Sequence, residues 1–142
     1  MRKIAFITGA SSGFGASIAK RLDDDGYSVI ICARRKQKLQ ELAKILKNPC
    51  LVLELDVRDK NAVFSAVNSL KDEWARIDIL VNNAGLALGQ EKTPNASLED
   101  FEIMIDTNIK GLVYVTKALL GHLNKGGIIF NLGSVAGCWP YP

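Results

Sequence analysis

Residues 8–15, Thr-Gly-Ala-Ser-Ser-Gly-Phe-Gly, decide the fold that this sequence can adopt. They follow an apolar run at residues 4–7, and after them Ile18, Ala19 and Leu22 recur on one face of a helix. A glycine-rich turn between a strand and a helix brings backbone N–H groups and the helix dipole to a pyrophosphate. We therefore predict a nucleotide-binding loop, with candidate contacts at Gly9, Ser11, Ser12, Gly13, Phe14 and Gly15.

The spacing of the glycines, G-x-x-x-G-x-G, narrows the kind of nucleotide that this loop binds. It differs from the dinucleotide fingerprint G-x-G-x-x-G, and no Lys-Ser or Lys-Thr pair follows it, which disfavours a P-loop. The alternative is a glycine-rich turn without a ligand. The position between a strand and a helix favours the binding loop.

Strand-like and helix-like segments alternate through the rest of the chain, which is typical of a parallel sheet with helices on its faces. Strands are predicted at residues 4–7, 28–33, 51–55, 77–81 and 127–132. Helices are predicted from about residue 15 to Gly26, through Leu39 and Leu46, from an N-cap at Asp59 to Trp74 and, with a break, from Ser97 to Leu120. The fold class is therefore α/β, a doubly wound, Rossmann-like parallel sheet, and residues 1–142 form one dinucleotide-binding domain.

Composition and charge indicate a single globular domain. Of the 142 residues, 48% are hydrophobic, which is enough for one core. The net charge of +3 comes from 18 basic and 15 acidic residues that are interleaved, which gives little support to a nucleic-acid partner. Nucleic-acid binding through residues 34–38 is disfavoured as well, because this basic patch is short and has no aromatic platform.

The cysteines, the histidine and the apolar runs set limits on location and metal chemistry. Cys32, Cys50 and Cys138 form no C-x-x-C pair, so a reducing, cytoplasmic compartment is expected. His122 is the lone histidine and belongs to no metal-ligand cluster, so no metal is expected. No run reaches the roughly eighteen apolar residues that span a membrane, so no membrane partner is expected.

The end of the second strand, Cys32-Ala33-Arg34-Arg35, predicts the form of the dinucleotide. In this fold an acid there binds the ribose 2′-hydroxyl of NAD, whereas an arginine accommodates the 2′-phosphate of NADP. No carboxylate stands at this junction, and each guanidinium can contact a phosphate with two N–H groups. NADP is therefore the expected cofactor. The alternative is that residues 34–38 form only a solvated helix start.

Further motifs complete a recognisable set. They are Asp56-Val57 after the third strand, Asn82-Asn83-Ala84-Gly85 after the fourth, Asn108 in the next helical region and Gly133-Ser134 after the fifth. Together with the glycine loop, they make essentially the whole chain resemble the short-chain dehydrogenase/reductase family. Within that family, residues 77–89 and 133–141 look most like the NADP-dependent 3-hydroxy acid, or serine, dehydrogenase branch.

The resemblance implies a role for each of these residues. The carboxylate of Asp56 would bond the adenine amino group and the backbone of Val57 would hold the ring; the alternative is that Asp56 only caps a turn. Asn82 would tie strands together. Catalysis in the family uses Asn, Ser, Tyr and Lys, of which Asn108 and Ser134 are present, although Ser134 taken alone would be a turn residue. The residues that would run alongside the cofactor, or would merely make a turn, are Asn83, Ala84 and Gly85.

One family motif, Tyr-x-x-x-Lys, would fall beyond Ser134 and is absent; Tyr141 is the only tyrosine after that serine. We therefore interpret the chain as the N-terminal part of an NADP-dependent oxidoreductase, truncated before its C-terminal strands and helices. The resemblance implies hydride transfer between NADP(H) and a small hydroxy acid or carbonyl compound, no activity in the truncated chain, and homo-oligomers at full length. The alternative is a dinucleotide-binding module without turnover.

Overall fold

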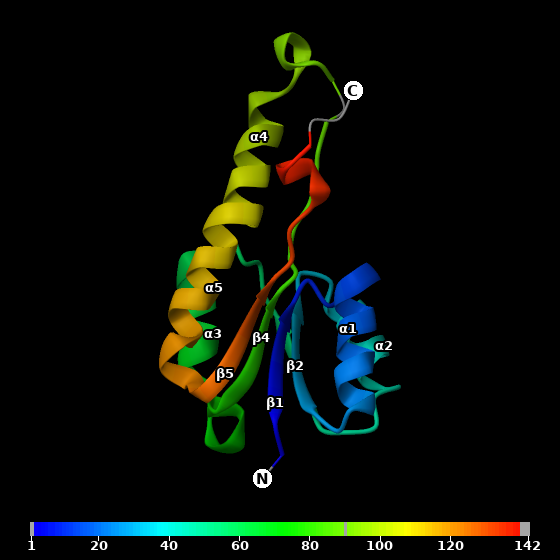
Figure 1. Cartoon of the computed structure of the whole chain (residues 1–142), viewed down its shortest axis with the longest axis vertical. Coiled ribbons are helices and arrows are strands. Elements are labelled where there is room, and N and C mark those ends of the chain that lie inside the picture. The colour runs from blue at the N-terminus through cyan, green and yellow to red at the C-terminus, as the bar shows by residue number, and fades with distance from the viewer. Residues whose placement is uncertain (1, 90, 140–142) are drawn as a thin grey trace.

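The computed structural model describes residues 2–89 and 91–139 (Figure 1). Its parallel strands are β1 (Ile4–Thr8), β2 (Ser28–Ala33), β3 (Cys50–Glu54), β4 (Ile77–Asn82) and β5 (Leu123–Asn131). Its α-helices are α1 (Gly13–Asp24), α2 (Lys36–Ala43), α3 (Lys60–Asn68), α4 (Leu98–Ile105) and α5 (Leu112–Leu119).

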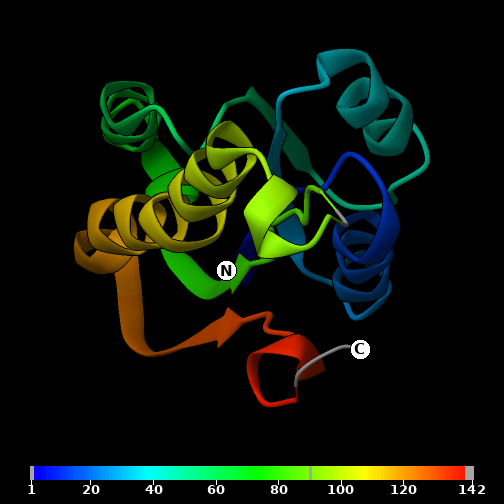
Figure 2. The same ribbon diagram turned by 90° about the horizontal axis from the view of Figure 1, so that it is seen from above.

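The strands form one sheet in the order β3-β2-β1-β4-β5. Helices α1 and α2 pack on one face and α3 and α5 on the other, as the view from above shows (Figure 2). From β1 the sheet grows outward in both directions, so the predicted doubly wound fold is confirmed. In such a sheet ligands bind beyond the carboxyl ends of the strands where the order reverses, which is here between β1 and β4.

The central strands are buried on both faces because their sequences are continuous apolar runs. Every residue of β1 and β2 is buried. Because alternate side chains point to opposite faces, Phe6 and Ile30 pack toward α3 and α5, whereas Ile7 and Ile31 pack toward α1 and α2. Two apolar cores therefore hold β1, the strand that leads into the glycine loop.

The ends of several elements differ from prediction. Helix α1 begins at Gly13, before residue 15, and α3 ends at Asn68. A separate 3₁₀ turn, Asp72–Ala75, follows α3, so the predicted helix as far as Trp74 is wrong. Strand β5 begins at Leu123 rather than at residue 127, and its pairing with β4 contains a register shift. The polar and glycine residues at its start had concealed it.

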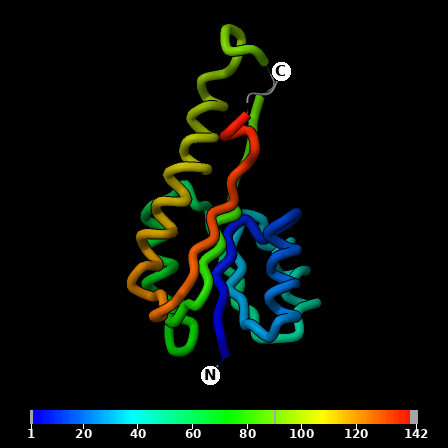
Figure 3. Tube along the Cα trace, viewed as in Figure 1, coloured from blue at the N-terminus to red at the C-terminus, as the bar shows by residue number. Residues whose placement is uncertain are grey.

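Two predicted caps and one predicted break are confirmed. The side chain of Asp59 accepts a hydrogen bond from Ala62 N at 2.9 Å, and that of Ser97 accepts one from Asp100 N at 3.4 Å. The break is the π-helical segment Asp106–Gly111, and α4, this segment and α5 form one continuous rod (Figure 3). Such segments occur often at functional sites, and this one carries Asn108.

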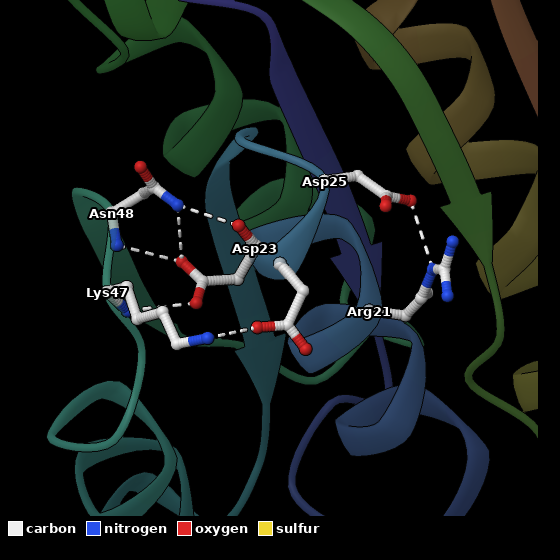
Figure 4. A network of polar contacts seen from close by, with 6 residues as sticks. Arg21, Asp23, Asp25, Lys47 and Asn48 are labelled. Atoms are coloured by element: carbon white, nitrogen blue, oxygen red, sulfur yellow. Dashed lines mark hydrogen bonds and ion pairs between the residues drawn. The ribbon is translucent and has the colours of Figure 1, made fainter.

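Asp23, near the end of α1, ties this helix to the loop between α2 and β3 (Figure 4). Asp23 is 3% exposed, and its carboxylate accepts hydrogen bonds from Lys47 N and Asn48 N, both at 2.8 Å. Burial disfavours the charged carboxylate, but these backbone N–H groups outweigh burial and hold the pKa of Asp23 below its ordinary value of 3.8. This network, called the Asp23 clamp below, fastens α1 to the loop that leads into β3.

We expect Asp23→Ala to lower the free energy of unfolding by about 3 kcal/mol, because it leaves two partly buried N–H groups without acceptors. Asp24→Ala is the matched control: it removes only an exposed ion pair with Lys47 and should cost less than about 1 kcal/mol. Urea unfolding at pH 7 measures both. Equal losses in the two variants would contradict the claim that the Asp23 clamp stabilises the fold.

The same clamp predicts a pH dependence. Because the pKa of Asp23 is lower in the folded chain than in the unfolded chain, folding favours the ionised carboxylate. Its contribution is therefore complete above pH of about 4 and is lost as the pH falls through the folded pKa. The difference in stability between the unaltered chain and Asp23→Ala should shrink in unfolding experiments at pH below about 3. A difference that grows on acidification would contradict this.

Strand β5 forms one edge of the sheet and, within the described residues, pairs only with β4. Ile128 and Phe130 are each 50% exposed, and Phe130 lines an apolar hollow together with Ile18 and Leu22 of α1. Ile129 points to the opposite face and packs into the core beside α5. An exposed apolar edge of this kind can pair with a second copy of itself.

We expect the chain to self-associate through this edge, and Ile128→Lys to raise its soluble fraction. Ile129→Lys, one residue away, should instead lower the free energy of unfolding by about 2 kcal/mol, because it places a charge in the core. Size-exclusion chromatography with light scattering at several concentrations measures the association. A concentration-independent monomer of the unaltered chain would show that the edge does not pair.

Candidate nucleotide-binding site

A hollow of ≈ 180 Å³, called the groove below, lies beyond the carboxyl ends of β1 to β4. It brings together most of the residues predicted to contact a cofactor, and it adds Ala33, Leu55, Leu86 and Thr107, which the sequence had not indicated. The predicted residues that line it are Gly9, Ser11, Ser12, Arg34, Arg35, Asp56, Val57, Ala84 and Gly85. Loops far apart in the sequence therefore build one site.

Two glycines of the loop are required by its packing. Gly9 has φ +64°, and a Cβ there would lie 2.8 Å from the Cα of Ala84. A Cβ on Gly15 would lie 2.4 Å from the carbonyl oxygen of Gly9. Only glycine permits both close approaches, so the glycine loop can lie against the turn that follows β4.

The first turn of α1 keeps its backbone donors available. Ser12 stands at the N-cap, but its side chain makes no capping hydrogen bond, and the first turn contains no acidic residue. The first N–H groups of a helix have no partner inside the helix, and they attract anions together with the helix dipole. A phosphate group therefore fits at this helix end, next to Ser11 and Ser12, which line the groove.

The hydroxyl of Ser12 contacts Arg35 instead of capping the helix. Arg35 Nη2 donates hydrogen bonds to Ser11 Oγ at 2.9 Å and to Ser12 Oγ at 2.7 Å. The guanidinium is thereby held at the rim of the groove, and Arg34 lines the groove beside it. Two cations and two hydroxyl groups at one rim suit a bound phosphate.

Thr8 is the main residue that the sequence analysis missed. Its Oγ1 accepts hydrogen bonds from Asn83 N at 3.0 Å and Ala84 N at 2.9 Å. In return, Asn83 Nδ2 donates to the carbonyl oxygens of Thr8, at 2.9 Å, and Gly9, at 3.1 Å. These bonds join the glycine loop to the turn after β4, and the signal for them was a hydroxyl residue at the first position of the motif.

Asn82 ties strands together, as predicted. Its Nδ2 donates to Asn131 Oδ1 of β5 at 2.8 Å and to Thr116 Oγ1 of α5 at 2.9 Å. The side chain is buried at the end of β4. It therefore fixes β5, and the chain that follows it, relative to the groove.

Asp56 lines the groove, two residues after the end of β3. Its carboxylate accepts hydrogen bonds from both the side chain and the backbone N–H of Arg58. The side-chain bond from Arg58 is the largest cause that holds the pKa of Asp56 low, and the charge of Arg34 adds to it. Asp56 is thus an ionised acceptor at the groove and also a residue of the turn that carries Arg58, and its contact with adenine stays a prediction.

Asn108 lies in the π-helical segment, where its amide is engaged by the backbone of Leu86. Its Oδ1 accepts from Leu86 N at 2.9 Å, and its Nδ2 donates to Leu86 O at 2.7 Å. A Cβ on Gly85 would lie 3.3 Å from Asn108 Oδ1, so the glycine makes room for this pairing. Asn108 therefore positions the loop that borders the groove.

Ser134 follows β5 and lies outside the lining of the groove. Its Oγ accepts a hydrogen bond from Ala136 N at 3.1 Å and caps a short 3₁₀ turn, Val135–Gly137. The oxygen acts there as an acceptor, so its hydrogen can still be donated to another group. Tyr141 lies outside the described residues.

Phe14 lies elsewhere than its place in the motif indicated. Its side chain is 78% exposed and lines the apolar hollow beside Phe130 and Leu132, not the groove. Gly13, with φ +56°, also contributes no lining to the groove.

The cysteines take no part in the groove. The three cysteines are free, and burial raises the pKa of the Cys32 thiol to about 12, so that thiol stays protonated. Across residues 2–89 and 91–139, no group of three His, Cys, Asp or Glu side chains is placed to hold a metal ion. Within the same part of the chain, no helix is long and apolar enough to cross a membrane.

Comparison with known proteins identifies the family. A model of the short chain dehydrogenase family matches residues 3–142. The chain therefore belongs to the short-chain dehydrogenase family, as the glycine loop and the other motifs had indicated.

Two relatives within the family are about 50% identical to this chain. The chain is 51% identical over 140 residues to the NADP-dependent 3-hydroxy acid dehydrogenase YdfG of Escherichia coli strain K12, with 97% of this chain and 56% of the relative covered. It is 50% identical over 147 residues to sulfoacetaldehyde reductase 2 of Chromohalobacter salexigens, of which it covers 58%. The chain thus spans little more than half the length of these relatives.

A solved structure of a dehydrogenase closely matches the fold of this chain. The closed form of serine dehydrogenase complexed with NADP⁺ superposes with a TM-score of 0.91 at 49% identity, over 97% of this chain and 56% of that one. The sheet and helices described above therefore match a little more than half of that structure.

Proposed function

We propose that this chain forms the NADP(H)-binding part of an oxidoreductase that transfers hydride between NADP(H) and a small hydroxy acid or carbonyl compound. The observation that carries the proposal is the rim of the groove, where Arg35 is fixed by Ser11 and Ser12 next to Arg34. The similarity to the E. coli relative, an NADP-dependent 3-hydroxy acid dehydrogenase, supports the same conclusion.

Different residues in and around the groove would hold the successive parts of NADP(H). Arg34 and Arg35 would hold the 2′-phosphate, and the first turn of α1 would hold the pyrophosphate. Apolar side chains would contact the adenine ring, with Asp56 accepting a hydrogen bond from its amino group. The turn at residues 83–85 would border the nicotinamide half. The apolar contacts would come from Ala33, Leu55 and Val57.

Bound there, the nicotinamide supplies or accepts the hydride. Ser134 would donate its hydroxyl hydrogen to the substrate oxygen, and Asn108 would act through the loop that it positions. A proton must also move, and an unassisted tyrosine, with a pKa of about 10, does this poorly at neutral pH. Because the Tyr-x-x-x-Lys motif is absent from residues 1–142, we propose that these residues alone do not turn over substrate.

We further propose that the full-length protein assembles with other copies in the cytoplasm. Exposed apolar side chains lie on one stripe of the rod from α4 to α5, at the helical spacing of about four residues. Such a stripe favours burial against a partner helix. Its members are Ile105, Ile109 and Val113, and the exposed Leu120 follows two turns later, just past the end of α5. The free cysteines support a reducing compartment.

The decisive experiment joins residues 1–142 to the C-terminal part of the E. coli relative and assays reduction of NADP⁺ with 3-hydroxy acids. The joined protein is expected to be active, and residues 1–142 alone are expected to be inactive. Robust turnover by the short chain would show that another group replaces the missing pair. A folded joined protein that binds NADP⁺ without turnover would favour a dinucleotide-binding module.

A further inference from the structure

Arg58 lies beside the groove, and the motifs quoted above give it no role. Its guanidinium donates hydrogen bonds to the carboxylate of Asp56 from two separate N–H groups. Nε lies 3.0 Å from Oδ1, and Nη2 lies 2.7 Å from Oδ2. The backbone N–H of Arg58 donates to Oδ1 as well, at 3.0 Å. Nε also lies 3.1 Å from Oδ2, so three N–H groups of one residue, one of them shared between the two oxygens, fix one orientation of this carboxylate.

The pair is only partly open to solvent, since the side chains of Arg58 and Asp56 are 33% and 31% exposed. Asp56 lines the groove, whereas Arg58 does not, so the arginine holds the carboxylate from outside the site. A carboxylate oxygen can accept about two hydrogen bonds. Oδ1 receives the backbone N–H and the Nε–H of Arg58, whereas Oδ2 receives Nη2 at 2.7 Å and only a share of the Nε–H at 3.1 Å, so Oδ2 has the capacity for one more donor.

We propose, as an extension of the NADP(H) site proposed above, that Arg58 is a positioning residue for recognition of the adenine amino group. It holds Asp56 ionised and in the orientation in which Oδ2 accepts an N–H from a purine in the groove. A carboxylate oriented in this way favours a purine that carries an amino group and repels one that carries a carbonyl oxygen at the same place. Arg58 thereby makes the groove prefer adenine over hypoxanthine nucleotides.

The charges around the pair agree with this role. Hydrogen bonding to Asp56, followed by the charge of Asp56, raises the pKa of Arg58, and Asp106 at the start of the π-helical segment adds to it. Asp56 is in turn held ionised by Arg58 and by Arg34. The positive charges of Arg58 and Arg34 keep the carboxylate of Asp56 ionised, and therefore an acceptor. They also stabilise the orientation in which it faces Arg58. An arginine fork supplies this geometry, whereas a single point charge would not.

Calorimetric titration of the 142-residue chain with adenosine 2′,5′-bisphosphate and with inosine 2′,5′-bisphosphate tests the proposal. The two probes carry the same phosphates and differ only in the purine. The unaltered chain should bind the adenine probe about tenfold more tightly, the effect of one hydrogen bond to a charged group. Arg58→Gln should reduce this preference to about twofold and leave the affinity for the inosine probe unchanged.

Two more variants make the test specific. Arg21→Gln is the matched control, because it removes an exposed arginine from its ion pair with Asp25 on α1, and it should leave the preference unchanged. Asp56→Ala should abolish the preference. Adding Arg58→Gln to Asp56→Ala should then change the preference no further, since Arg58 acts through Asp56.

The outcomes separate this inference from the proposed function. Equal weakening of both probes by Arg58→Gln would overturn the inference, because Arg58 would then serve only the stability of the loop. An adenine preference that survives Arg58→Gln would overturn it too. Binding of both probes without any preference would overturn the inference alone. Failure of the unaltered chain to bind either probe would overturn the NADP(H) site, and the inference with it.

Discussion

Replacing Ser134 by alanine is expected to slow turnover by about 10²–10³-fold in the protein that joins residues 1–142 to the C-terminal part of the E. coli relative. This is the usual loss when one hydrogen-bond donor to the developing charge is removed. The oxygen of Ser134 accepts from Ala136 N, which leaves its hydrogen to be donated to a substrate oxygen. The measurement is the steady-state rate of NADP⁺ reduction with saturating 3-hydroxy acid.

Ser69→Ala is the matched control for this prediction. Ser69 is an exposed serine after α3 whose hydroxyl donates to the carbonyl oxygen of Ala66, at the other end of the sheet from the groove. Its loss should leave the rate unchanged. If Ser134→Ala turns over as fast as this control, Ser134 is only the cap of its own turn.

Arg35→Asp is expected to weaken NADPH binding by about 100-fold. The change removes a charge-assisted contact to the 2′-phosphate and adds a repulsion, together about 3 kcal/mol. NADH lacks this phosphate, so its affinity should change little, and the preference between the two cofactors should reverse. The structure makes Arg35 the better test position than Arg34, because Ser11 and Ser12 fix its guanidinium.

Lys38→Asp controls for the loss of positive charge near α2. Lys38 lies on the exposed side of that helix and pairs with Glu41 at 3.4 Å. Its replacement changes the net charge by the same amount but should alter NADPH affinity only slightly, through long-range electrostatics that salt screens. Fluorescence titration of both variants with NADPH and NADH is the measurement. Similar losses in both would show that Arg35 has no specific contact with the phosphate.

The sequence predicted the sheet well because each central strand is a short, continuous apolar run. The glycine loop was also predictable, since a strand, three glycines and a helix follow one another within fifteen residues. The start of β5 was not, because Asn124, Lys125 and Gly126 resemble a turn although they extend the strand. The end of α3 was missed for a similar reason: Leu70 and Trp74 continue the apolar spacing, but a 3₁₀ turn carries Trp74.

The candidate site was predictable as a set of residues but not as a set of contacts. Arg35 reaches Ser11 and Ser12, and Asn108 pairs with the backbone of Leu86, only because the sheet brings separate loops together. No local pattern contains such long-range pairings. Thr8 was overlooked for the same reason, since its partners follow β4, more than seventy residues away.

The central claim is that the groove of this chain binds NADP(H) through the 2′-phosphate. Equilibrium titration of the unaltered 142-residue chain with NADPH and with NADH, at one salt concentration, tests it most directly. The structure predicts that NADPH binds at least about tenfold more tightly, because Arg34 and Arg35 stand at the rim where the 2′-phosphate would lie. Equal affinities for the two cofactors would contradict the claim.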